Sequence, residues 1–306
     1  GQAMSILLLG KDGQVGWQLQ RSLAPHGEVI ACGRSECDLT DLDGLRSLVR
    51  KLKPGVIVNA AAYTAVDRAE SELELAMCIN GEVPGALAEE AAVLGALLIH
   101  YSTDYVYDGC KAEAYVETDR VNPQSVYGRS KLAGEDAIRA AGCKSLIFRT
   151  SWVFGARGGN FVKTILRLAR DKEMLNVVAD QIGSPTPAAM IATVTGVALA
   201  MVRKGRAMSG EEQRLYHLCC GRPVSWHEFA RTIVARAATM PGFNLRLAPD
   251  AIIGIPGSEY PAAAVRPANS RLDCTRLERD FDLCMPDWEP YLMRMLQLLS
   301  LKQNGY

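Results

Sequence analysis

The sequence predicts an α/β fold in which a doubly wound parallel sheet is followed by a smaller, interleaved region. Three observations predict it. Apolar runs of strand length alternate with helical patterns up to Trp152, and hairpin signals are almost absent from this part of the chain. Beyond Trp152, prolines divide the chain into shorter pieces. Strands that alternate with helices are typical of parallel sheets, because each parallel pair needs a crossover connection.

The elements of the first part follow one another regularly. The first strand is predicted at 6–9, where four apolar residues stand together, and a glycine turn then opens a helix that carries Trp17, Leu19 and Leu23. Further strands are predicted at 29–32, 56–58, 96–101 and 146–149. The helices between them are predicted at about 42–52, 73–94 and 131–141.

The second part still contains helical patterns, at 188–202 and 226–238. The run 215–218 is apolar and aromatic, and we expect it to return as a strand to the first sheet. The expected domains are therefore 1–170 and, for the most part, 171–306. Segments near 188–220 are expected to rejoin the first domain.

Composition excludes several classes of function. The 306 residues include 34 Lys and Arg and 34 Asp and Glu, so the net charge gives no reason to expect nucleic acid or an anionic membrane as a partner. The nine cysteines are odd in number and form no CxxC pair, which argues against a disulfide framework or a zinc site. No apolar run approaches the roughly 18 residues of a membrane span. We expect a cytoplasmic protein with reduced thiols and no bound metal.

A glycine turn carries the first functional signal. Gly10, Gly13 and Gly16 follow a predicted buried strand and open a helix, where backbone amides and the helix dipole can hold a pyrophosphate. Close packing of the helix on the strand is the alternative reading of the same glycines. The position favours a Rossmann-type dinucleotide-binding domain.

Two further motifs indicate proton transfer near a carbonyl group. Tyr127 and Lys131 are four residues apart and share one face of a predicted helix, so the ammonium can lower the pKa of the phenol. Ser102 and Thr103 follow a predicted strand, and their hydroxyls therefore lie at the carboxyl edge of the sheet. Taken alone, each motif is also common as a solvated surface feature.

At this point the chain resembles the extended short-chain dehydrogenase/reductase superfamily, which has a glycine turn, a Ser/Thr strand end and a YxxxK motif in this order. Within that superfamily it closely resembles the dTDP-4-dehydrorhamnose reductases. The resemblance covers about Met4 to Leu296. It is carried by the runs 59–67, 102–107, 148–154 and 266–272.

The resemblance implies a role for particular residues. It implies a catalytic set of Thr103, Tyr127 and Lys131. The cofactor contacts it implies are Gly10, Gly13, Gln14, Val15, Gly16, Asp38, Leu39, Ala60, Ala61, Ala62 and Tyr63, with Tyr127 and Lys131. The substrate contacts it implies are Thr103, Asp104, Trp152, Arg266, Asn269 and Arg271. The arginines suit a pyrophosphate, although each could instead form a structural salt bridge.

The implied activity is reduction, by NADPH or NADH, of the C4 keto group of dTDP-4-dehydro-β-L-rhamnose. The sequence after the second strand favours NADPH. Arg34 offers a forked donor to a 2′-phosphate and Ser35 adds a hydroxyl, whereas no carboxylate stands at the strand tip and Glu36 and Asp38 come later. The partner expected from the implied reaction is its small sugar-nucleotide substrate.

Three alternatives remain open. Another sugar-nucleotide reductase or an epimerase of the superfamily could have this sequence. A 4,6-dehydratase would resemble Thr-Asp-Glu at the strand end, but Tyr105 follows Asp104 here. A non-catalytic regulatory subunit is the third alternative, against which the intact Thr103, Tyr127 and Lys131 argue. In some relatives a magnesium ion held by glutamates bridges a dimer. Gln18 stands at that position, so we expect a monomer or weak homodimer.

Overall fold

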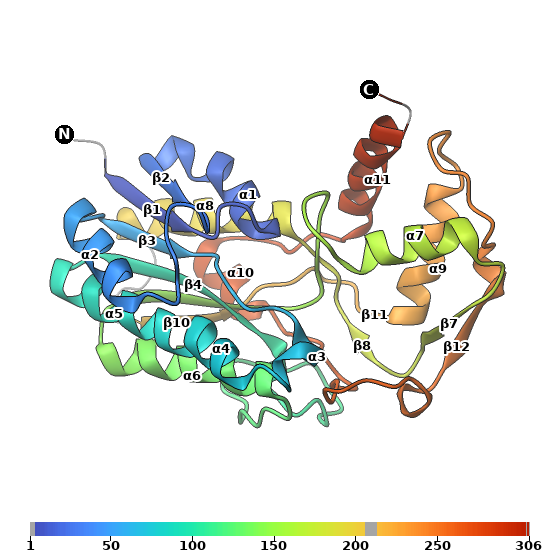
Figure 1. The fold of residues 1–306 in the computed structure, drawn as a ribbon, viewed down its shortest axis with the longest axis horizontal. Coiled ribbons are helices and arrows are strands. Elements are labelled where there is room, and N and C mark those ends of the chain that lie inside the picture. Colours follow the sequence, from blue (N-terminus) through green and yellow to red (C-terminus); the bar gives the residue numbers. More distant parts are fainter. Residues whose placement is uncertain (1–3, 206–212, 304, 306) are drawn as a thin grey trace.

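The computed structural model describes residues 4–205, 213–303 and 305 of the chain. Its main element is a six-stranded sheet in which every neighbouring pair is parallel (Figure 1). The predicted fold class is confirmed. From one edge to the other the strands are β2 (Glu28–Cys32), β1 (Ser5–Leu9), β3 (Val56–Asn59), β4 (Leu97–Thr103), β5 (Lys144–Thr150) and β10 (Gln213–His217).

Helices cover both faces of this sheet, which explains why its strands are almost continuously apolar. Along β1, Ile6 and Leu8 pack into one hydrophobic cluster, and Leu7 and Leu9 pack into another on the opposite face. The helices of the Leu7 face are α2 (Leu42–Leu52), α5 (Val83–Leu94) and α6 (Val126–Ala141). Those of the Ile6 face are α1 (Gln14–Ser22), α8 (Ala188–Arg203) and α10 (Thr275–Phe281).

A smaller region lies beside the large sheet and contains α7, α9 and α11 (Figure 1). Aromatic rings hold it together: Trp226 stacks on Trp152 with ring centres 3.4 Å apart, and Phe229 packs against Trp288. Its helices are α7 (Phe161–Asp171), α9 (Trp226–Ala237) and α11 (Glu289–Gln303). Its paired strands are β6 (Val153–Phe154) with β9 (Thr186–Pro187), β7 (Leu175–Val178) with β12 (Ile252–Ile255), and β8 (Ile182–Gly183) with β11 (Val224–Ser225).

Most predicted elements are present, with two differences. The helix predicted at 73–94 consists of α4 (Leu73–Met77), a π-helical turn (Cys78–Glu82) and α5, and the short α3 (Val66–Ala69) precedes it. Helix α6 begins at Val126 rather than near Lys131, because the Ser125 side chain accepts a hydrogen bond from Gly128 N and caps it. The strand predicted near 215–218 is present as β10, which joins the edge of the large sheet beside β5.

Among the described residues, no helix is both long and apolar enough to cross a membrane. No group of three or more His, Cys, Asp and Glu in this part of the chain could hold a metal ion. The cysteines are all free thiols.

Candidate functional site

The glycine turn lies where the direction of strand order reverses, between β1 and β3, which is the usual ligand position in open α/β sheets. Gly10 has a left-handed φ of +80°, and a Cβ there would lie 2.6 Å from Ala61 N. A Cβ at Gly16 would lie 1.8 Å from Gly10 O. Gly13 precedes α1 and no side chain caps that helix. The bare helix end therefore fits a pyrophosphate.

Apart from Tyr127 and Lys131, the other residues implied to contact a cofactor come from α1 and from the loops after β2 and β3. Gln14 Oε1 accepts a hydrogen bond from Asn160 Nδ2 at 3.1 Å, and Val15 packs against the core. After β3, the loop Ala60–Tyr63 is held at Tyr63, whose backbone N–H and C=O both bond Asn80. Asn80 also donates to Ser130 Oγ on α6, so the turn after β3 is tied to the helix that carries Tyr127. Asp38 accepts hydrogen bonds from Thr40, and Leu39 packs against the hydrophobic cluster that contains Leu7 and Leu9.

The tip of β2 differs from the expectation. Glu36 folds back on the strand end and accepts hydrogen bonds from Gly33 N and Ser35 Oγ, both at 2.8 Å. Its carboxylate also pairs with Lys11 Nζ at 3.0 Å, which lowers the pKa of Glu36 to about 2. The prediction that no carboxylate stands at the tip is therefore wrong, because the loop reverses direction there. Arg34 is exposed and has no ionic or hydrogen-bonded partner among the described residues.

Thr103, Tyr127 and Lys131 come together at the carboxyl end of β4. Thr103 is buried, and its hydroxyl donates to Asp104 Oδ1 at 3.3 Å and accepts from Tyr105 N at 3.1 Å. Tyr127 occupies the first turn of α6, with its ring edge-on to Tyr105. One turn later, the buried Lys131 donates from Nζ to the Tyr101 carbonyl at 2.7 Å. A hydroxyl, a phenol and an ammonium thus lie within one small polar region.

Burial is the largest cause of the pKa shifts of Tyr127 and Lys131. Burial raises the pKa of Tyr127 to about 12, although the Thr103 hydrogen bond opposes this. The sequence-based expectation of a lowered tyrosine pKa is not met, because Lys131 bonds the Tyr101 carbonyl. Burial lowers the pKa of Lys131 to about 8, opposed by the negative charge of Glu135. Tyr127 is consequently a neutral acid near pH 7.

A buried charged network that the sequence did not indicate includes Glu135, whose negative charge acts on Lys131. Arg149 on β5 forms a two-pronged ion pair with Glu135 on α6, with contacts of 2.5 and 2.9 Å. Ser102 donates to the same carboxylate at 2.5 Å, and Tyr107 accepts from Arg149 at 2.7 Å. Both ionic side chains are at most 2% exposed. The network joins β4, through Ser102, to β5 and α6.

Asp104 and Trp152 flank the same region. Asp104 is buried, its Oδ2 has no hydrogen-bond partner among the described residues, and burial raises its pKa to about 7. Trp152 has a left-handed φ of +49° and is wedged between Trp226 and Gly183. A non-glycine residue in this conformation is strained, and such strain often marks a ligand site.

The three residues of the 266–271 segment already have partners within the protein. Arg266 forms a two-pronged ion pair with Asp67, with contacts of 2.8 and 2.9 Å. Asn269 donates to the carbonyls of Lys111 and Glu113 and accepts from Arg271. These side chains thus connect separate loops, and contact with a nucleotide stays a prediction.

Asp104→Asn should change how stability depends on pH. The carboxyl has a pKa of about 7 in the folded protein and about 3.9 when unfolded, so the stability it contributes is present below pH 4 and is lost as the pH rises to 7. Between pH 4 and 7 the wild-type unfolding free energy should fall by about 3–4 kcal/mol relative to the variant. Urea unfolding of both proteins across this range measures it. Parallel pH profiles would contradict the assignment.

Comparisons with known proteins agree with this geometry. Residues 4–301 match the family model described as RmlD substrate binding domain. The chain is 48% identical over 285 residues to the dTDP-4-dehydrorhamnose reductase of Burkholderia thailandensis, a match covering 93% of this chain and 95% of that protein. It is 46% identical over 301 residues to that of Salmonella typhimurium, covering 96% and 97%.

A solved structure is also similar over its whole length. The dTDP-4-dehydrorhamnose reductase of Bacillus anthracis, in complex with NADP, superimposes with a TM-score of 0.85 at 34% identity. The match covers 97% of this chain and all of that one.

Proposed function

The chain belongs to the dTDP-4-dehydrorhamnose reductase family, and from this we propose that it is an NAD(P)H-dependent oxidoreductase. It reduces the C4 keto group of dTDP-4-dehydro-β-L-rhamnose to give dTDP-L-rhamnose, the last step of dTDP-rhamnose biosynthesis. The observation that carries the proposal is the placement of the buried Thr103 hydroxyl at the end of β4, with Tyr127 in the first turn of α6 and the buried Lys131 one helical turn later.

Each group has a distinct role in this proposal. The nicotinamide, when bound, supplies the hydride to C4 of the sugar. Thr103 donates a hydrogen bond to the keto oxygen, where negative charge develops. Tyr127 gives that oxygen its proton, and the charge of Lys131 stabilises the resulting phenolate. Lys131 also holds the ribose of the cofactor, while Trp152 and Asp104 position the sugar ring.

Domain organisation follows from the same proposal. Residues 1–170 bind the dinucleotide and residues 171–306 mostly the substrate, with 188–220 contributing to the first domain. Arg266, Asn269 and Arg271 lie on the substrate side. We further propose a cytoplasmic protein that is a monomer or weak homodimer, since Gln18 supplies no carboxylate for a bridging magnesium ion.

Incubation with dTDP-4-dehydrorhamnose and NADPH tests the activity. We expect loss of the absorbance of the reduced cofactor together with appearance of dTDP-L-rhamnose, identified by mass spectrometry and NMR. Free sugars should not react, because the nucleotide anchors the ring. Cofactor binding without turnover of any sugar nucleotide would favour the regulatory-subunit alternative, and a different reduced sugar would favour another reductase of the superfamily.

Arg34→Ala tests the proposed preference for NADPH over NADH. Arg34 has no partner among the described residues and can pair with a 2′-phosphate, while Lys11 compensates the nearby charge of Glu36. The substitution should weaken NADPH binding and leave NADH binding nearly unchanged. Dissociation constants for both cofactors should be measured at one fixed ionic strength, because exposed phosphate pairing is screened by salt. Equal wild-type affinities, or equal weakening of both, would remove Arg34 from this role.

A further inference from the structure

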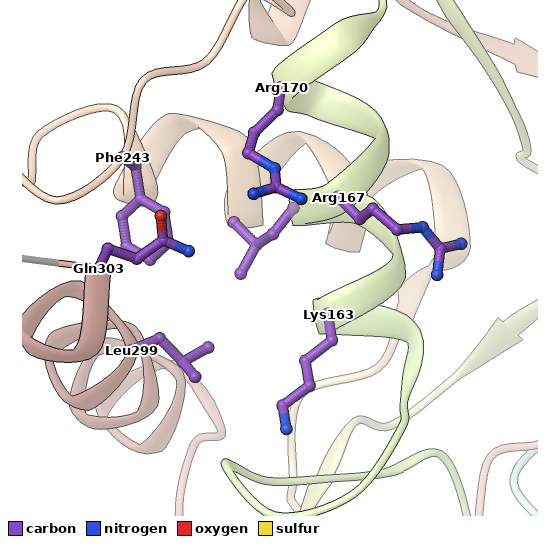
Figure 2. Close-up of a pocket in the computed structure, with 7 residues that line it drawn as sticks. Lys163, Arg167, Arg170, Phe243, Leu299 and Gln303 are labelled. Carbon is purple, nitrogen blue, oxygen red and sulfur yellow. The ribbon is translucent and has the colours of Figure 1, made fainter.

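A cavity of about 190 Å³ lies between α7 and α11, and none of its lining residues belongs to the proposed reductase site (Figure 2). Its α7 wall carries three cationic side chains, Lys163, Arg167 and Arg170. Spacings of four and three residues place them on one face of the helix. No acidic residue lines the cavity. The net charge of the whole chain is zero, so this positive charge is a local feature.

These three cations differ from most others nearby. Among the described residues, none of their side chains forms a hydrogen bond or an ion pair, whereas Arg246 pairs with Glu173 and Arg236 with Glu289. The charges that act on Lys163 are the cations Lys302 and Arg157, and burial is the first cause that lowers its pKa. The positive charges of Lys302 and Arg157 acting on Lys163, with no counter-charge to it among the described residues, favour a bound anion there.

The rest of the cavity is apolar. Leu166 is buried below the cations, and Phe243 and Leu299 form the opposite side. Figure 2 shows Phe243 and Leu299 facing α7, with Lys163 and Arg170 extending from the helix toward the space between. An inorganic anion alone would leave these apolar groups in water. The lining therefore suits a ligand with both an anionic and an apolar part.

We propose that this cavity binds a small organic phosphate, with its phosphate between Lys163 and Arg170 and its apolar or aromatic part against Phe243 and Leu299. Figure 2 shows the Arg167 guanidinium turned away from this space, so the cations that face it are Lys163 and Arg170. A guanidinium and an ammonium match a dianion better than a single carboxylate, and the guanidinium can donate two hydrogen bonds to phosphate oxygens. Such a site is separate from the proposed dinucleotide and sugar-nucleotide sites.

Titration calorimetry with phenyl phosphate tests the proposal. The double substitution Lys163→Ala/Arg170→Ala should weaken binding at least about tenfold, which corresponds to about 1.4 kcal/mol. Arg120→Ala/Arg294→Ala is the matched control, because it removes the same charge from exposed arginines outside the cavity. The control should retain wild-type affinity. Equal binding by the cavity variant, or equal weakening by the control, would overturn the proposal.

A second variant tests the apolar half of the site. Phe243→Ala should weaken phenyl phosphate and leave the affinity for inorganic phosphate within about twofold of the wild type, since only the ring contact is lost. Equal loss for both probes, or for neither, would contradict a ligand with an apolar part. Both tests measure binding without turnover, so their outcome does not depend on the reductase activity.

Discussion

Tyr127→Phe is expected to lower turnover by about two to four orders of magnitude, the range that follows removal of a general acid. The substitution deletes one oxygen and leaves the ring, which packs edge-on against Tyr105. Its hydroxyl is the proposed proton donor to the keto oxygen, and its loss leaves the sheet unchanged because Tyr127 lies on α6. Steady-state rates at saturating substrate and cofactor measure the effect.

Cofactor affinity is the control for this variant. Tyr127 is one of many residues proposed to contact the cofactor, and the contacts at the glycine turn do not involve its hydroxyl, so the dissociation constant of NADPH should stay nearly unchanged. A variant with near-normal turnover would remove Tyr127 from the mechanism. A large loss of cofactor binding would instead indicate a structural role for the hydroxyl.

Arg149→Met is expected to lower the free energy of unfolding by about 3–5 kcal/mol, because it leaves the buried Glu135 carboxylate without its counter-charge. Ser102 alone still donates to that carboxylate. The side chain of methionine has a volume similar to that of arginine, so a cavity contributes little. Chemical unfolding followed by circular dichroism measures the loss.

The double variant Arg149→Met/Glu135→Met separates the charge effect from packing. Removing both members leaves no buried carboxylate without its partner, although it also removes the negative charge that acts on the buried Lys131. Replacing such a pair by apolar residues is often neutral or stabilising. We expect the double variant to recover most of the stability lost in the single one. A double variant that is less stable than Arg149→Met would show that the ion pair itself stabilises the fold.

The sheet could be predicted because apolar residues fill both of its faces. The strand at 6–9 needs no information from distant residues, since its four apolar side chains alternate between two hydrophobic clusters. The start of α6 was predicted too late, because Val126 follows a polar loop with no helical periodicity. The cap formed by Ser125 is the local signal that could have located it.

The candidate site was predictable only in part. Thr103 and Tyr127 were expected together because a strand end and a following helix meet at the sheet edge in this fold, and the structure has Thr103 at the end of β4 and Tyr127 in the first turn of α6, which packs against β4. The partner of Glu135 lies on β5, fourteen residues away in sequence, and its burial depends on packing across two strands. The fold-back of Glu36 depends on Lys11 from the preceding turn. Neither contact can be predicted from the spacing of residues in the sequence.

The order of the strands has a consequence for synthesis on the ribosome. β10 completes the sheet by pairing with β5, yet 62 residues separate the end of β5 at Thr150 from the start of β10 at Gln213. Until that strand emerges, the nascent chain presents the unpaired backbone of β5, with apolar side chains such as Leu146 and Phe148 beside it. Exposed strand edges recruit other strands and favour aggregation. Protection of β5 during translation therefore depends on how quickly the later part of the chain is made.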